Sequence, residues 1–222
     1  YRLIGLSTRL PVQPYGVSFH VGSQQRDIGQ WGYLISTCRY LFDSAREFNV
    51  ELKMINLGGG LPAQYFDPTP PIALYASEIR RFLEEDFGKD LPEIFIEPGR
   101  GMVGDAGILV TEVVLISKKS QVNPYSWVYL DTGKFGGLIE TLDEAIKYPV
   151  YVDKKGPSQK VILAGPTCDS VDVLYEQFKY ELPVTLAEGD RVYFLSTGAY
   201  TASYCSVNFN GFPPLTTHIF ED

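Results

Sequence analysis

The order of the predicted elements in the first hundred residues constrains the fold most. Three short apolar segments, near residues 15–22, 52–60 and 93–97, alternate with two segments whose apolar residues recur at helical spacing, near 27–50 and 73–88. A strand and a helix that repeat in this way favour parallel strands joined by crossover helices. The predicted fold class of this half is therefore α/β.

The character of the chain changes after about Gly107. Runs rich in Val, Tyr and Ile, separated by turn residues, predict strands, and only residues 136–147 and the stretch after Ser196 look helical. The predicted strands lie near residues 108–120, 125–133, 148–153, 159–167 and 190–197. The sequence thus predicts two domains, an α/β domain over residues 1–107 and an all-β domain over residues 108–222.

Composition and charge narrow the function classes. The chain has 222 residues, 45% of them hydrophobic, and a formal net charge of −8. Nucleic-acid binding depends on clusters of Lys and Arg, which the sequence lacks, so a nucleic-acid partner is not expected. No apolar run approaches the ~20 residues that span a bilayer, so no membrane partner is expected either.

The cysteine content points to a reducing compartment. Cys38, Cys168 and Cys205 stand far apart, and none belongs to a CxxC motif. This pattern argues against a disulfide framework and against a metal site, and it predicts a cytoplasmic location. Cys38 and Cys205 are expected to be buried and inert.

Four clusters of glycine and polar residues directly follow predicted strands. They are His20 and Ser23; Gly58, Gly59 and Gly60; Glu97, Gly99 and Arg100; and Cys168, Asp169 and Asp172. The carboxyl ends of parallel strands form the edge that carries the site in α/β barrels and open sheets. The first three clusters are therefore expected to share one edge.

Each cluster also has a plain structural interpretation. Three consecutive glycines present bare backbone N–H groups to an anion such as phosphate, but they equally suit a tight turn. Pro98 and Gly99 are expected to turn the chain sharply, so that Glu97 and Arg100 face one pocket, unless the two form a surface ion pair. His20 alone would more often be structural, and Cys168 with its neighbouring acids equally suits a buried small apolar residue with a capping Asp.

Taken together and in this order, the clusters resemble the fold-type III pyridoxal-phosphate decarboxylases, the ornithine, diaminopimelate and arginine decarboxylase family. The resemblance rests on "FHVGSQ", "GGG", "EPGR", "GPTCDSVD", "GAYT" and "FNGF", and it extends from about Tyr15 to Phe212. It implies pyridoxal 5'-phosphate as the cofactor. It also implies the C-terminal half of a (β/α)8 alanine-racemase-like barrel, followed by a Greek-key or sandwich-like β-domain.

The resemblance assigns roles to individual residues. Glu97 would pair with the cofactor's ring nitrogen and keep it protonated, and His20 would act in catalysis by stacking on the ring. Cys168 would be the catalytic proton donor after CO2 leaves, and Asp169 would bind the distal ammonium of the substrate. The phosphate end of the cofactor would be bound by Ser23, Gly58, Gly59, Gly60, Gly99, Arg100 and Tyr200.

The same resemblance bears on substrate and partners. Asp169 after Cys168, in place of the Cys-Glu of diaminopimelate decarboxylases, favours a substrate that ends in an ammonium. That implies L-ornithine decarboxylation to putrescine in polyamine biosynthesis, with L-lysine decarboxylation to cadaverine as the alternative. Glu140 or Asp143 would supply a second substrate carboxylate. The family's homodimer, in which Cys168 and Asp169 reach the partner's cofactor, is expected here.

The resemblance also implies a piece that the sequence does not contain. The family holds its cofactor through a Schiff-base lysine on the first barrel strand, and none of the lysines here has that context. The chain also starts without an initiator Met, in what reads as the middle of a helix. We therefore expect the N-terminal half of the same protein as a partner, and inactivity of the 222 residues alone.

Two other functions compete with the decarboxylase. A non-catalytic relative of ornithine decarboxylase, which binds regulators of polyamine synthesis, would typically lose the cofactor and catalytic residues, and these are intact here. An alanine-racemase-like isomerase shares the barrel and the cofactor. It would place an arginine at the ring nitrogen where this sequence has Glu97, and it would have no use for Cys168.

Overall fold

The computed structural model describes residues 2–122 and 124–221, and the chain divides into two compact units. The first unit comprises Tyr1–Ala63 and Thr69–Met102, and the second comprises Gln64–Pro68 and Val103–Asp222. The sequence led us to expect a boundary at residue 107. The contacts divide the chain at Met102, and they assign the short segment after the glycines to the second unit.

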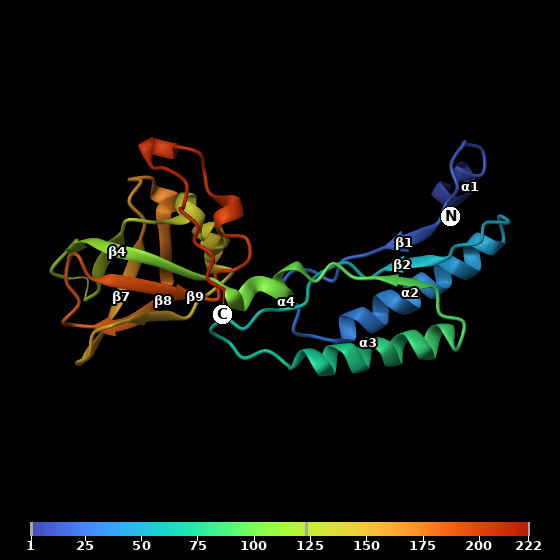
Figure 1. Ribbon diagram of the computed structural model, residues 1–222, viewed down its shortest axis with the longest axis horizontal. Helices are drawn as coiled ribbons and strands as arrows, with labels where there is room; N and C mark the ends of the chain where they lie inside the picture. Colours follow the sequence, from blue (N-terminus) through green and yellow to red (C-terminus); the bar gives the residue numbers. More distant parts are fainter. Residues whose placement is uncertain (1, 123, 222) are drawn as a thin grey trace. The chain divides into compact units, whose positions relative to one another are not determined.

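The first unit is a three-stranded parallel sheet with crossover helices (Figure 1). The strand order β1-β2-β3 and the parallel pairing confirm the predicted alternation, although each strand is only three residues long. The elements are α1 (Arg2–Ser7), β1 (Gly16–Ser18), α2 (Gly29–Arg46), β2 (Met54–Asn56), α3 (Ile72–Phe87), β3 (Glu93–Phe95) and α4 (Gly99–Val103).

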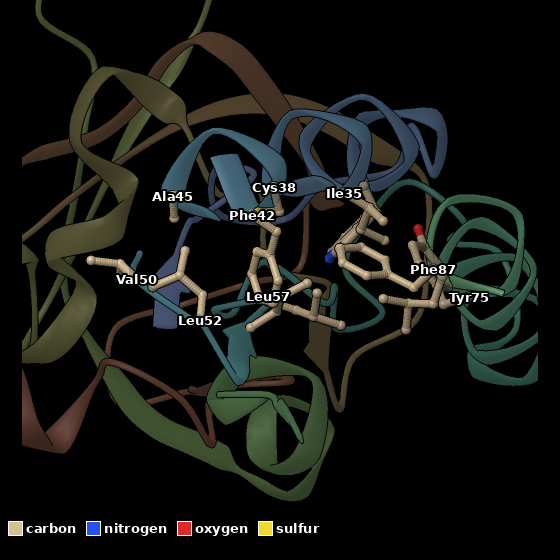
Figure 2. Close-up of a cluster of buried hydrophobic side chains, with 12 residues drawn as sticks. Ile35, Cys38, Phe42, Ala45, Val50, Leu52, Leu57, Tyr75 and Phe87 are labelled. Atoms are coloured by element: carbon tan, nitrogen blue, oxygen red, sulfur yellow. The ribbon is translucent and has the colours of Figure 1, made fainter. Parts of the chain in front are cut away.

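The core of the first unit lies where α2 and α3 cover one side of the sheet (Figures 1 and 2). The buried residues of α2 recur every three or four positions, as in an amphipathic helix. Two edge-to-face aromatic pairs join the helices, Trp31 with Tyr75 and Phe42 with Phe87. α3 ends at Gly88, whose φ of 64° suits glycine. The packing of two apolar helix faces therefore holds the short strands in place.

The segment after β3 turns at Pro98 and continues as a short helix. Gly99 begins the short helix α4, and Arg100 lies within it. Pro98 directly precedes the helix, where its fixed φ and its missing N–H group are tolerated. Its carbonyl oxygen accepts a hydrogen bond from the backbone N–H of Met102 at 3.0 Å. The predicted turn at Pro98-Gly99 is present, since the Gly99 N–H donates to the Glu97 carbonyl at 3.0 Å, and it continues into a helical turn that was not predicted.

The second unit is rich in strands, as the sequence predicted. All five predicted strand segments contain a strand, and one further strand, β8, was missed. The strands are β4 (Ile108–Ser117), β5 (Ser126–Leu130), β6 (Val150–Val152), β7 (Ser158–Ala164), β8 (Val173–Pro183) and β9 (Arg191–Leu195). Short helical turns lie before, between and after the strands: η1 (Gly104–Ala106) precedes β4, η2 (Lys134–Leu138), η3 (Ile139–Glu144) and η4 (Ser170–Asp172) lie between strands, and η5 (Ala202–Tyr204) and η6 (Phe209–Gly211) follow β9.

These six strands form one mixed sheet in the order β6-β9-β4-β5-β7-β8. The first half of β4 pairs with β9 and the second half with β5, and the register shifts between Val113 and Leu115. β5 and β7 are parallel, and the other pairs are antiparallel. The expected Greek-key or sandwich-like detail stays a prediction. The helix expected over residues 136–147 is replaced by η2 and η3, which are interrupted at Gly137 and Asp143.

Candidate active site

The three glycines pack the loops of the first unit together at the carboxyl ends of β1, β2 and β3. A Cβ atom on Gly58 would clash with the carbonyl oxygen of Phe19. A Cβ on Gly59 would lie 2.7 Å from the carbonyl oxygen of Glu97, and one on Gly60 would lie 2.5 Å from that of Gly22. Only bare backbone fits such close approaches. The glycine run thus joins the loops after all three strands.

Asn56, the last residue of β2, orients the candidate cofactor carboxylate. Its Nδ2 donates to Glu97 Oε1 at 2.5 Å, and its Oδ1 accepts from the Gly58 N–H at 2.9 Å. The Glu97 N–H donates in turn to the Gly58 carbonyl at 2.8 Å. Sequence reasoning missed Asn56, although a polar residue between an apolar strand and the glycines was a usable signal. The carboxylate of Glu97 is therefore held by its neighbours.

His20 lies on the loop after β1, beside the glycines. Its Nδ1 accepts a hydrogen bond from the Gly22 N–H at 2.8 Å, which places the hydrogen of a neutral ring on Nε2. Nε2 lies 3.3 Å from the position of a Cβ on Gly59. The structure thus brings His20, the glycine run and Glu97 to one edge of the sheet.

Ser23 is exposed on a loop that is bound to the glycine segment. Next to it, the side-chain amide of Gln24 donates to the Ala63 carbonyl at 2.7 Å and accepts from the Ala63 N–H at 3.1 Å. The backbone N–H of Gln25 donates to the Gly60 carbonyl at 2.9 Å. These bonds fix Ser23 close to Gly60, as a shared site requires.

Gly99 and Arg100 belong to α4, which follows Glu97 along the chain. Gly99 is exposed, whereas Arg100 is only 5% exposed. A guanidinium stays charged, so its burial requires polar or charged partners. A Cβ on Gly101 would lie 3.0 Å from the Cβ of Leu61, so α4 packs closely against the segment after the glycines. The backbone of α4 that carries Arg100 is therefore held beside the segment after the glycines.

In the second unit, Cys168 and Asp169 lie on the loop between β7 and β8. Cys168 is exposed and has a φ of 58°, an uncommon left-handed conformation for a residue other than glycine. The Asp169 carboxylate accepts from the Val171 N–H at 2.8 Å and caps η4. Cys205 is only half-buried, so the expectation of burial was wrong for it, while Cys38 is buried as expected.

The remaining predicted residues lie elsewhere in the second unit. Glu140 is half-buried at η3, and Asp143 is exposed with a φ of 52°. The adjacent Glu144 accepts backbone N–H bonds from residues 176, 177 and 178 of β8. Tyr200 follows β9, with a φ of 54° and its ring 5.6 Å from that of Tyr204.

Lys134 is a buried ionisable residue that the sequence did not single out. Its pKa is lowered by burial, and the negative charges of Asp172, Asp143 and Glu144 oppose that shift. A lysine in a glycine-rich turn reads as a surface residue, so the sequence carried no signal for its burial. The segment that contains Asp143 and Glu144 and the loop that contains Asp172 therefore both lie near the Lys134 ammonium.

Two further findings concern metal ions and membranes. Within residues 2–122 and 124–221, no group of three or more His, Cys, Asp and Glu side chains could hold a metal ion. None of the helices in this part of the chain is both long and apolar enough for a membrane crossing.

Comparison with known proteins identifies the family. Residues 19–198 match the family model described as pyridoxal-dependent decarboxylase, C-terminal sheet domain. The chain is 31% identical to the lysine/ornithine decarboxylase of Selenomonas ruminantium, over 93% of this chain and 51% of that protein. It is 32% identical to antizyme inhibitor 2 of Xenopus laevis, over 98% of this chain and 50% of that protein.

A solved structure shows the same architecture. The lysine/ornithine decarboxylase of Vibrio vulnificus, complexed with cadaverine, matches with a TM-score of 0.84 and 30% identity, over 96% of this chain and 57% of that one. The chain spans about half the length of the curated relatives it matches. The chain belongs to the pyridoxal-dependent decarboxylase family, and the pyridoxal phosphate expected from the sequence is that family's cofactor.

Proposed function

We propose that the complete polypeptide decarboxylates a basic L-amino acid with pyridoxal phosphate. The substrate we favour is L-ornithine, which gives putrescine, and the alternative is L-lysine, which gives cadaverine. The observation that carries the proposal is the Glu97 carboxylate, held by Asn56 beside His20 and the glycine run at one sheet edge. The Cys168-Asp169 pair supplies the chemistry that the first unit lacks.

The residues at this edge fit the cofactor. A carboxylate suits a protonated ring nitrogen, an imidazole suits a ring face, and bare glycine backbone with a guanidinium suits a phosphate. Pyridoxal phosphate supplies the electron sink for the electrons left when CO2 departs. In this proposal Glu97 pairs with the ring nitrogen and His20 lies against the ring. The phosphate is bound by Ser23, Gly59, Gly60, Gly99, Arg100 and Tyr200, while Gly58, whose N–H donates to Asn56 Oδ1, shapes the turn beside them.

Cys168 and Asp169 act on the substrate. The exposed thiol of Cys168 donates a proton to the carbon that lost CO2, which fixes an amine as the product. A carboxylate offers about four lone-pair sites, so Asp169 can cap η4 and still accept from the distal ammonium of the substrate. Asp169→Ala is accordingly expected to act mainly on KM.

A second carboxylate would set the preferred chain length of the substrate. Glu140 and Asp143 are the candidates, and they lie on one short segment of the second unit. Glu144 is a poor candidate because its carboxylate already accepts three backbone N–H groups of β8. The distance of the second acid from Asp169 would then separate ornithine from lysine.

The proposed assembly is a cytoplasmic homodimer with shared active sites. Cys168 and Asp169 of one subunit would serve the cofactor of the other. The lysine that holds the cofactor would come from the N-terminal half of the same protein, as the resemblance implies.

A non-catalytic regulator is the second candidate function. It is favoured by the 32% identity to antizyme inhibitor 2. The presence of Glu97, Arg100, Cys168, Asp169 and Tyr200 argues for the enzyme, because such relatives typically lose these groups.

The test is CO2 release by the complete polypeptide with pyridoxal phosphate on four substrates: L-ornithine, L-lysine, L-arginine and meso-diaminopimelate. We expect a dominant rate on ornithine or lysine, and a KM at least about tenfold higher in Asp169→Ala, the effect of losing one charge-assisted contact. No release from any substrate, together with no cofactor absorbance, would favour the regulator. An unchanged KM in Asp169→Ala would remove Asp169 from the ammonium site.

A further inference from the structure

Asp172 is a buried carboxylate at the end of the loop that carries Cys168. Its side chain is among the most buried polar groups, with 2% of the residue exposed. Oδ1 accepts from the Lys134 N–H at 2.7 Å, and Oδ2 accepts from the Thr167 N–H at 3.2 Å and from Thr167 Oγ1 at 2.6 Å. Three donors thus converge on one carboxylate.

Two glycines make room for this carboxylate. A Cβ atom on Gly133 or on Gly165 would clash with Asp172 Oδ1. The backbones of two segments more than thirty residues apart therefore close directly on the same side chain. A longer acid would not fit between them, and a smaller residue would leave buried N–H groups without an acceptor.

The backbone of Asp172 also closes the loop. Its carbonyl accepts from the Gly165 N–H at 2.7 Å, and its N–H donates to the Asp169 carbonyl at 3.0 Å. Cys168 lies within this closed segment in a left-handed conformation, which costs energy and persists only where the surroundings enforce it. The contacts of Asp172 on both sides of Cys168 are suited to enforce it.

We propose that Asp172 is a positioning residue that fixes the direction of the Cys168 thiol. It does so by binding Thr167, directly before Cys168, to the turn at Gly133 and Lys134. This inference rests on the proposed function, in which Cys168 delivers the proton. Asp172 itself touches neither substrate nor cofactor in this role.

The consequence concerns which carbon receives the proton. A thiol aimed at the substrate carbon gives CO2 and the amine. If the proton goes instead to the carbon on the cofactor, hydrolysis gives CO2, an aldehyde and the amine form of the cofactor, and no external oxidant is needed. A loosened Cys168 loop should therefore raise the share of aldehyde. A merely structural role would lower stability and leave this share unchanged.

The experiment compares five variants of the complete polypeptide. Asp172→Asn puts an amide donor against N–H donors, and Thr167→Val removes one donor while keeping the shape. Thr167→Ser keeps the hydroxyl. Its ratio of amine to aldehyde should therefore lie closer to that of the unmodified protein than the ratio of Thr167→Val does. Cys168→Ser tests the proton donor directly. Leu182→Ala, in the buried part of β8, is the stability control.

Two measurements are made on each variant. The first is the ratio of amine to aldehyde with pyridoxal phosphate and the preferred substrate. The second, without cofactor, is hydrogen exchange at the amides of Lys134 and Thr167. In Asp172→Asn we expect the ratio to fall and both amides to exchange faster, each by about tenfold, the effect of losing one hydrogen bond to a charged acceptor. Thr167→Val should give a smaller change in the same direction.

The variants distinguish a failure of the proposed role of Cys168 from a failure of the proposed role of Asp172. If Cys168→Ser leaves the ratio unchanged, the role of Cys168 in the proposed function fails, and this inference fails with it. If Cys168→Ser changes the ratio but Asp172→Asn and Thr167→Val do not, the inference alone is overturned. If the ratio changes as much in Leu182→Ala as in Asp172→Asn, the inference is also overturned, because lost stability would then explain the change in both variants. Should Asp172→Asn fail to fold, Thr167→Val decides the question.

Discussion

A single amide decides how the candidate cofactor carboxylate is presented. Glu97 is exposed two residues beyond the end of the three-residue strand β3, where a free glutamate would sample several rotamers. Asn56 removes that freedom, since its amide binds the carboxylate and its oxygen binds the glycine turn. A rigid support of this kind is what a cofactor-binding group requires.

Asn56→Ala should therefore weaken cofactor binding. We expect the Kd of the apo complete polypeptide for pyridoxal phosphate to rise about tenfold, because Glu97 loses a hydrogen bond and Gly58 loses an acceptor. Absorbance titration with the cofactor measures this. Ser36→Ala is the matched control, since it removes a 2.8 Å bond to Asp86 elsewhere in the same unit. Equal affinities in both variants would show that Asn56 does not support the site.

At the scale of elements, two segments of the second unit lock each other. Glu144 of η3 accepts the N–H groups of residues 176, 177 and 178, where β8 departs from its regular pairing with β7. In return, Tyr175 donates to the Ile146 carbonyl at 2.8 Å and Tyr180 donates to that of Tyr148 at 2.5 Å. The segment with the candidate substrate acids is thereby held on the sheet.

Glu144→Ala should release this lock. We expect hydrogen exchange at amides 176–178 to accelerate at least about tenfold, because three N–H groups lose a charged acceptor. Glu144→Gln, which keeps one oxygen, should give a smaller change. Glu188→Ala serves as control, because Glu188 accepts a single backbone bond of 3.4 Å on the surface. Unchanged exchange in Glu144→Ala would mean that the three contacts do not stabilise β8.

At the scale of the whole molecule, each unit contains one of the two tryptophans. Trp31 belongs to the helical core of the first unit, and Trp127 lies on β5 of the second. The second unit also buries Tyr175 and Tyr180, whose pKa values are both raised, mainly because burial disfavours the phenolate. Burial also raises the pKa values of Tyr75 and Cys38 in the first unit, so the alkaline response of the second unit has to be followed separately.

The second unit should lose stability above pH ~10. An unfolded tyrosine ionises near that pH while Tyr175 and Tyr180 stay protonated, so the free energy of unfolding falls as pH rises. Urea unfolding followed by Trp127 fluorescence in a Trp31→Phe chain measures this at pH 8 to 11. Tyr175→Phe and Tyr180→Phe should each flatten the decline. Tyr193→Phe, at a half-buried position on β9, should leave the decline unchanged. If the free energy of unfolding falls identically in all variants, Tyr175 and Tyr180 are not the cause of the decline.

The order of helices and strands could be predicted wherever apolar residues recur with a regular local spacing. Apolar periodicity gave both long helices and the parallel strands, because an amphipathic face must be buried wherever it occurs. β8 was missed because its charged residues and irregular pairing break the alternation that marks a strand. The turn at Pro98-Gly99 was predicted, but the helical turn that follows it was missed, although the same dipeptide also suits the start of a helix.

The sequence by itself determined the family, because "HVGS", "GGG", "EPGR" and "GPTCD" are local motifs that can be recognised without knowledge of the fold. Only the tertiary structure decided which distant residues bind to one another. Asn56 and Glu97 are 41 residues apart, Lys134 and Asp172 are 38 apart, and Glu144 and Gln177 are 33 apart. Such bonds form only where the folded backbone brings distant donors and acceptors together, and neither composition nor periodicity predicts which of them will be in contact.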